Sequence, residues 1–146
     1  MKLIVAGEFY ENKEPYFDLV KKLKIEDHII FTDSFVKTED VKYYFSASDL
    51  VAQTYRTATQ SGVTQIAYHF ECPMLVTNVG GLAEIVPHNK VGYLVEKNPE
   101  DIAEHINEFF EKNKKGEFST NVAKLKFNFS WENIIDGIKS FFIDNQ

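Results

Sequence analysis

The stretch TYRTATQSG, residues 54–62, joins an apolar run to the start of an amphipathic segment and is rich in hydroxyl and amide side chains. In open α/β sheets ligands bind at the carboxyl ends of strands, and the free amides at a helix N-terminus favour phosphate. Gly62 has no side chain, so a pyrophosphate can approach its backbone closely. The plainer alternative is that these residues only form a loop and cap a helix. The candidate donors are Thr57, Thr59, Gln60 and Ser61.

A second polar stretch, TNVGGLAE at residues 77–84, follows the next apolar run. Gly80 and Gly81 remove two side chains at a strand end, and Glu84 lies in the first turn of the helix that follows. Taken alone, this pattern indicates a tight turn with a glutamate stabilised by the helix dipole. Two such strand ends in successive units favour a ligand site. Gly7 is a weaker candidate, because no G-x-G-x-x-G accompanies it.

The elements that must position these residues alternate between apolar, β-branched runs and segments of helical periodicity. Continuous apolar runs such as LIVA and MLV are typical of buried parallel strands. The pattern predicts an α/β fold, with a Rossmann-like parallel sheet of about five strands flanked by helices. The predicted strands are Leu3–Ala6, Ile29–Thr32, residues 50–53, Met74–Thr77 and Gly92–Val95, and the predicted helices between them are residues 15–23, 39–47 and 62–70.

Two helices are expected after the last strand, on either side of a break at residues 114–116. The first begins near Pro99, which suits a first helical turn. The second begins with Ser130 as its N-cap and Glu132 in its first turn. A chain of 146 residues suits one domain with one core. The apolar stripe of the last helix is Trp131, Ile134, Ile135, Ile138, Phe141 and Phe142.

Composition excludes several classes of function. A net charge of −6 without clustered Lys and Arg argues against nucleic acid. A single cysteine, Cys72, rules out an intrachain disulfide and favours a cytoplasmic location. The N-terminal apolar run is too short for a signal peptide or a transmembrane segment. The four histidines neither cluster nor form a ligand motif, so no metal site is expected, and Cys72 beside Pro73 looks structural rather than nucleophilic.

Four motifs, in register over nearly the whole chain, resemble the C-terminal, nucleotide-sugar-binding domain of retaining GT-B glycosyltransferases, family 4-like. That large group builds bacterial polysaccharides and lipopolysaccharides from nucleotide sugars. LIVAGEFY is similar to the family's second strand and its glycine, and FSWENI to its closing helix. HIIFTDSFVKTEDVKYYFSASDLVAQTY and TATQSGVTQIAYHFECPMLVTNVGGLAEIVPHNKVGYLVE are similar to the strand block and the donor-site core.

The resemblance implies a donor site. Backbone amides of residues 59–62 would hold the nucleotide diphosphate, Phe35 and Val36 would lie near the base, and Gly80, Gly81 and Leu82 would lie beside the sugar and phosphates. The implied activity is hexosyl transfer from a nucleoside-diphosphate sugar to a glycan or lipid-linked acceptor, without a cofactor. The resemblance also allows membrane association of the full-length enzyme.

Two pocket positions depart from the family pattern. Many relatives carry two glutamates eight residues apart, which touch the donor sugar and the ribose, and the matching residues here are Ala58 and Ile66. Neither side chain can accept a hydrogen bond. Gln60 and Gln65 are candidates to substitute, although Gln65 points about 100° away from Ile66 on a helix.

The matched region also begins late, since the family domain starts one strand and one helix earlier and follows an acceptor-binding N-terminal domain. Strands next to the absent first strand must close up, pair with another chain or stay exposed. We expect the isolated chain to be inactive. The alternatives are a non-catalytic α/β nucleotide-binding module that needs a separate N-terminal partner, and a Rossmann-like binder of another phosphate ligand.

Overall fold

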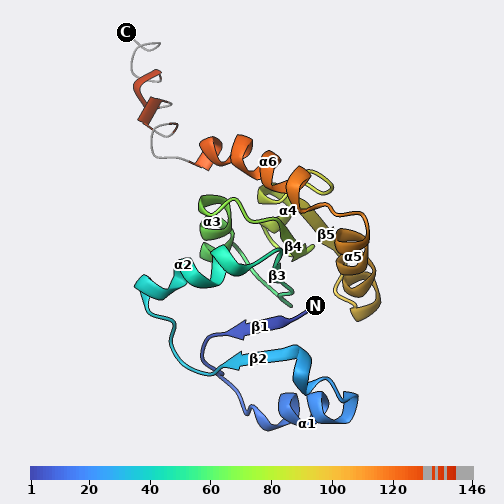
Figure 1. Ribbon diagram of the computed structural model, residues 1–146. Helices are drawn as coiled ribbons and strands as arrows, with labels where there is room; N and C mark the ends of the chain where they lie inside the picture. Colours follow the sequence, from blue (N-terminus) through green and yellow to red (C-terminus); the bar gives the residue numbers. More distant parts are fainter. Residues whose placement is uncertain (130–132, 134, 137, 141–146) are drawn as a thin grey trace. The chain divides into compact units, whose positions relative to one another are not determined.

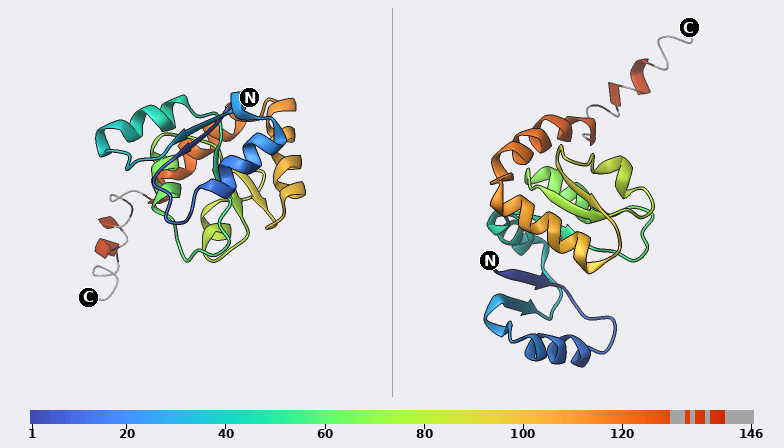
Figure 2. Two further views of the ribbon diagram at one scale, coloured as in Figure 1. Left: turned by 90° about the horizontal axis from the view of Figure 1, so that it is seen from below. Right: turned by 90° about the vertical axis from the view of Figure 1, so that its right-hand side faces the viewer.

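The computed structural model describes residues 1–129, 133, 135, 136 and 138–140. The chain divides into two compact units, Met1–Lys42 and Tyr43–Gln146, which are described separately. Both are built from parallel strands and helices, as Figures 1 and 2 show. The α/β class is therefore confirmed. The five strands are found where they were predicted, but they are divided between a two-stranded and a three-stranded sheet.

The first unit is a β-α-β arrangement whose two strands run parallel, with Leu3 opposite Ile29 and Ala6 opposite Thr32. Phe9, Phe17 and Phe31 pack against one another with ring centroids 4.8 to 6.1 Å apart. Its elements are β1 (Leu3–Ala6), α1 (Glu14–Leu23), η1 (Glu26–His28), β2 (Ile29–Thr32) and the first half of α2 (Thr38–Ala47).

Strand β1 remains exposed although all its residues are apolar. Leu3, Ile4 and Val5 keep 49%, 41% and 37% of their surface accessible, and none of the residues of this unit is buried. Parallel sheets are normally covered on both faces, and two strands alone are marginally stable. Within this unit β1 therefore keeps its apolar side chains accessible.

The second unit contains a three-stranded parallel sheet in the order β3-β4-β5. Its central strand is buried along its whole length, with helices against both faces. The elements are β3 (Val51–Gln53), α3 (Gly62–His69), β4 (Met74–Thr77), α4 (Leu82–Ile85), β5 (Gly92–Val95), α5 (Pro99–Glu111), α6 (Lys115–Leu125) and η2 (Lys126–Phe129).

Side chains of β4 alternate between two apolar clusters, because successive residues of a strand point to opposite faces. Met74 and Val76 pack with residues of α3 and α4, including Tyr68 and Leu82. Leu75 packs on the other face with a cluster that includes Phe109 of α5. The sheet and its helices therefore form a core that holds the strand ends rigidly.

Helix α6 was not predicted. The break expected at residues 114–116 is found at residues 112–114 instead, and Lys115 and Gly116 belong to α6. The low helix propensity of Gly116 is offset by the burial of Phe118 and Val122, one turn apart. The last predicted helix, from Ser130, falls mostly outside the described residues.

Candidate functional site

The two polar strand ends meet in the structure. β3 and β4 are adjacent and parallel, so the loops that follow them leave the same edge of the sheet. The backbone N–H of Gly81 donates a hydrogen bond to the carbonyl oxygen of Thr59 at 3.0 Å. Gly80 has a φ of +52°, and a Cβ on it would lie 1.7 Å from the carbonyl oxygen of Ala58. The glycine pair is therefore required for the contact between the loops.

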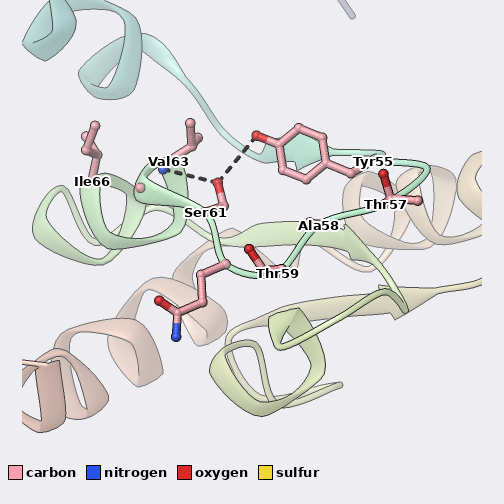
Figure 3. A pocket seen from close by; sticks show the side chains of 9 residues that line it. Tyr55, Thr57, Ala58, Thr59, Ser61, Val63 and Ile66 are labelled. Carbon is pink, nitrogen blue, oxygen red and sulfur yellow. Dashed lines mark hydrogen bonds between the residues drawn. The ribbon is translucent and has the colours of Figure 1, made fainter.

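An open pocket of about 600 Å³ lies at the end of β3, in front of the start of α3. None of the side chains that line it is charged, and Figure 3 shows their arrangement. It brings together all five polar or glycine residues of the 54–62 stretch that were proposed from sequence. The lining residues are Tyr55, Thr57, Ala58, Thr59, Gln60, Ser61, Gly62, Val63 and Ile66.

The start of helix α3 supplies the electrostatics of the pocket. Ser61 is the N-cap, in an extended conformation, and its Oγ accepts a hydrogen bond from the N–H of Val63 at 3.2 Å. A Cβ placed on Gly62 would meet no atom within 4 Å, so the space in front of this residue is open. The positive end of the helix dipole and its first amides therefore face a neutral, open surface that suits an anion.

Tyr55 is a pocket residue that the sequence interpretation did not single out. Its carbonyl oxygen accepts a hydrogen bond from the Thr77 hydroxyl at 2.7 Å, and its own hydroxyl lies 3.3 Å from the Oγ of Ser61. Thr77 lies 22 residues along the chain and is 1% exposed. Since the link is long-range, only the presence of a tyrosine beside the polar stretch could have hinted at it.

The other candidates of this unit lie outside the pocket lining. Gln65 is exposed on α3, whereas Ile66 lines the pocket, as the 100° step between neighbouring helical residues requires. Glu84 is exposed on α4. The side chain of Leu82 is completely buried in the core.

Gly7, Phe35 and Val36 belong to the first unit. Gly7 has a φ of +137° and donates its N–H to the carbonyl oxygen of Thr32 at 3.1 Å, so it ends the β1–β2 pairing. Phe35 is 72% exposed and Val36 is partly exposed. Their role near a nucleotide base stays a prediction.

Cys72 is buried, and its Sγ lies 3.2 Å from the carbonyl oxygen of Phe45. Burial raises the pKa of its thiol, which disfavours the thiolate needed for nucleophilic attack. Across the described part of the chain, no three His, Cys, Asp or Glu side chains are grouped so that they could hold a metal ion. The helices that are described include none with the length and apolar character to cross a membrane.

Comparison with known protein families identifies the family of this chain. The model of the family "Glycosyl transferases group 1" matches residues 1–126, which is most of the chain. The chain belongs to this family, whose domain has the GT-B fold. The match includes both strand ends and the whole pocket.

Individual relatives share the same region. Spore coat protein SA of Bacillus subtilis is 26% identical over 130 residues, which is 83% of this chain and 33% of that protein. Human alpha-1,3/1,6-mannosyltransferase ALG2 is 28% identical over 116 residues, 73% of this chain and 27% of that protein. The chain thus spans about a third of the length of these relatives.

A solved structure of Anabaena Alr3699/HepE in complex with UDP superimposes with a TM-score of 0.78 and 21% identity, over 96% of this chain and 41% of that one. At this identity the likeness concerns the fold. It shows that almost the whole chain, including both compact units, has a counterpart in one larger GT-B protein.

Proposed function

We propose that this chain is the donor-binding domain of a hexosyltransferase that uses a nucleoside-diphosphate sugar and a glycan or lipid-linked acceptor. One observation carries the proposal: a neutral, open pocket lies at the start of α3, where two polar strand ends meet, in a chain of glycosyltransferase group 1. The HepE structure with UDP supports a nucleoside diphosphate as the ligand class.

In this proposal the diphosphate lies over Gly62, because its backbone is open to the pocket and the helix dipole favours negative charge there. Thr57 and Thr59 line the pocket and donate from their hydroxyl groups to the diphosphate or the sugar. Gly80 and Gly81 hold the Ala58–Thr59 backbone in place beside the sugar. That Phe35 and Val36 lie near the base stays a prediction from the family resemblance.

Sugar transfer leaves a nucleoside diphosphate with extra negative charge, and fixed dipoles stabilise such a departing group best in a site that excludes water. The pocket lining contains no Lys or Arg side chain, so this chain contributes amides and hydroxyls. We assign the remaining contacts and the acceptor site to the other two thirds of a full-length enzyme. The isolated chain is therefore expected to bind the donor without transferring sugar.

Ala58 and Ile66 both line the pocket, so an apolar surface stands at the two positions where the family resemblance implies glutamates in many relatives. Gln60 also lines the pocket, whereas Gln65 does not. We therefore assign the hydrogen bonds to sugar or ribose hydroxyls to the amide of Gln60, which both donates and accepts.

The family match runs over residues 1–126 and so through both compact units, and this supports one C-terminal-type domain over residues 1–146. The family 4-like and retaining character, and a cytoplasmic location with membrane association of the complete enzyme, belong to the same proposal.

A thermal-shift and calorimetric titration with UDP, GDP, ADP, NAD and inorganic phosphate tests the site. Binding stabilises the folded protein by mass action and so raises the unfolding midpoint. At a free ligand concentration of 100 Kd the free energy of unfolding rises by about 2.7 kcal/mol. The Gly62→Asp variant places a carboxylate where the phosphate is expected and should abolish the shift. Gly116→Asp is the matched control, since a Cβ at either glycine meets no atom within 4 Å and both lie in the first turn of a helix.

The result expected is a shift with one nucleoside diphosphate that survives Gly116→Asp and is lost in Gly62→Asp. A preference for NAD or inorganic phosphate would favour another kind of phosphate binder. The absence of any shift at millimolar nucleoside diphosphate would contradict the proposal.

A further inference from the structure

Tyr55 is held at both of its polar ends. Its carbonyl oxygen accepts the hydrogen bond of Thr77, which is buried at the end of β4, and its hydroxyl contacts Ser61 at the start of α3. The ring is partly buried against the core cluster of the second unit. The residue therefore links the end of β3, the end of β4 and the helix cap, and Figure 3 shows the chain of contacts from Tyr55 through Ser61 to Val63.

One hydroxyl proton of the Tyr55–Ser61 pair is left without an acceptor among the described residues. A hydroxyl group has one proton and two acceptor lone pairs. The Oγ of Ser61 accepts the N–H of Val63 at 3.2 Å, which occupies one lone pair. The contact with Tyr55, at 3.3 Å, uses one of the two hydroxyl protons. The other hydroxyl proton has no acceptor among the described residues, and both residues line the pocket.

If Tyr55 donates to Ser61, both lone pairs of Ser61 are occupied and its only remaining capacity is to donate. Phosphate oxygens only accept hydrogen bonds, so a serine fixed in this way suits them, whereas a free lone pair turned toward them would repel them. The direction of this hydrogen bond therefore decides how well Ser61 fits an anion.

We propose that Tyr55 is a positioning residue, which fixes Ser61 as a hydrogen-bond donor to a phosphate oxygen of the nucleoside diphosphate. The inference rests on the proposed function, because it concerns the same pocket. It adds that the serine does not act alone: its orientation is set by a tyrosine that is itself anchored by Thr77.

The test is a double-mutant cycle between Tyr55→Phe and Ser61→Ala, with UDP and uridine as calorimetric ligands, or with the nucleotide and nucleoside of whichever base the chain binds. Tyr55→Phe should weaken diphosphate binding about fivefold when Ser61 is present, and should leave it unchanged in the Ser61→Ala background. Binding of the nucleoside, which lacks phosphate, should not change in either background. Ser61→Gly replaces Ser61→Ala if the loss of the helix cap unfolds the protein, since glycine is the better N-cap.

Tyr16→Phe is the matched control, because Tyr16 is 47% exposed on α1 and does not line the pocket. An equal loss of affinity in both Ser61 backgrounds, a parallel loss for the nucleoside, or no loss at all would overturn the role of Tyr55 while leaving the donor site intact. A parent protein that binds no nucleoside diphosphate would instead remove the proposed function, and this inference with it.

Discussion

Gly80 lies directly against the backbone of Ala58, so close that a Cβ on Gly80 would be 1.7 Å from the Ala58 carbonyl oxygen. The two residues come from loops that follow different strands. Their contact holds the second loop against the pocket wall, so the geometry of the wall depends on a residue that is not part of its lining.

Gly80→Ala should therefore destabilise the protein by about 2 kcal/mol or more, because it combines a left-handed backbone with a clash against main-chain atoms. Nucleoside diphosphate binding should fall as the loop is displaced. Urea unfolding measures the first effect and calorimetry the second. Gly116→Ala, in an open helical position, should be neutral or stabilise by up to about 1 kcal/mol, and an equal unfolding midpoint for the two variants would contradict the argument.

The buried side chain of Gln53 is a site where we expect a substitution to stabilise the protein. Gln53 is 3% exposed on β3, and both polar atoms of its side chain are buried without a hydrogen-bond partner in the described structure. An unsatisfied buried amide costs about 1–3 kcal/mol, so Gln53→Met, which keeps a similar shape, should raise the free energy of unfolding by about 1 kcal/mol. The exposed Gln65→Met is the control and should change stability by less than about 0.5 kcal/mol. A destabilised Gln53→Met would show that the amide has a partner in solution.

Because the pKa of Tyr68 is raised, we expect the protein to lose stability at high pH. Tyr68 is 2% exposed, donates to the carbonyl oxygen of Ile85 at 2.6 Å, and burial raises its pKa from 10.0 to about 12. Because the folded-state pKa lies above the unfolded value, the protonated tyrosine stabilises the fold fully below pH 10.0, and this contribution is lost as the pH rises toward about 12.

The Tyr68→Phe variant should lose about 1 kcal/mol at neutral pH with the hydrogen bond, and should show a shallower fall in stability above pH 10. The pKa of Tyr93 is also raised to about 12, by burial and by the charge of Glu108. Tyr93 therefore still contributes to the fall in stability at high pH in the Tyr68→Phe variant. Denaturant unfolding between pH 7 and 11 measures both effects. An identical pH dependence in parent and variant would rule out Tyr68 as its source.

The exposed apolar side chains of strand β1 lead us to expect that the isolated chain self-associates. Within the first unit β1 pairs with β2 and keeps its apolar side chains exposed, which favours pairing with a strand of another chain. Ile4→Lys should raise the concentration at which the chain associates, as measured by light scattering or sedimentation. Leu19→Lys, which introduces the same charge at a 52% exposed position of α1, should not; equal effects would point to net charge rather than to the strand edge.

The sequence by itself determined the strands, most helices and the polar stretch that lines the pocket. These features depend on local patterns: apolar runs four residues long, helical periodicity, and a serine that caps α3. Such patterns act over one or two turns and can be recognised without knowledge of the rest of the fold. Helix α6 was missed because the burial of Phe118 and Val122 outweighs a local signal for a break.

Only the tertiary structure decided how the polar residues work together. Taken alone, Gly80 and Gly81 indicated a tight turn at a strand end, and the structure adds that their missing side chains make room for the backbone of Ala58 and Thr59. Tyr55 is held by a hydrogen bond from Thr77, which is distant in sequence but lies on the neighbouring strand of the sheet. The division of five strands between two sheets was likewise decided by pairing. Contacts of this kind depend on which strands become neighbours, and local periodicity carries no information about that choice.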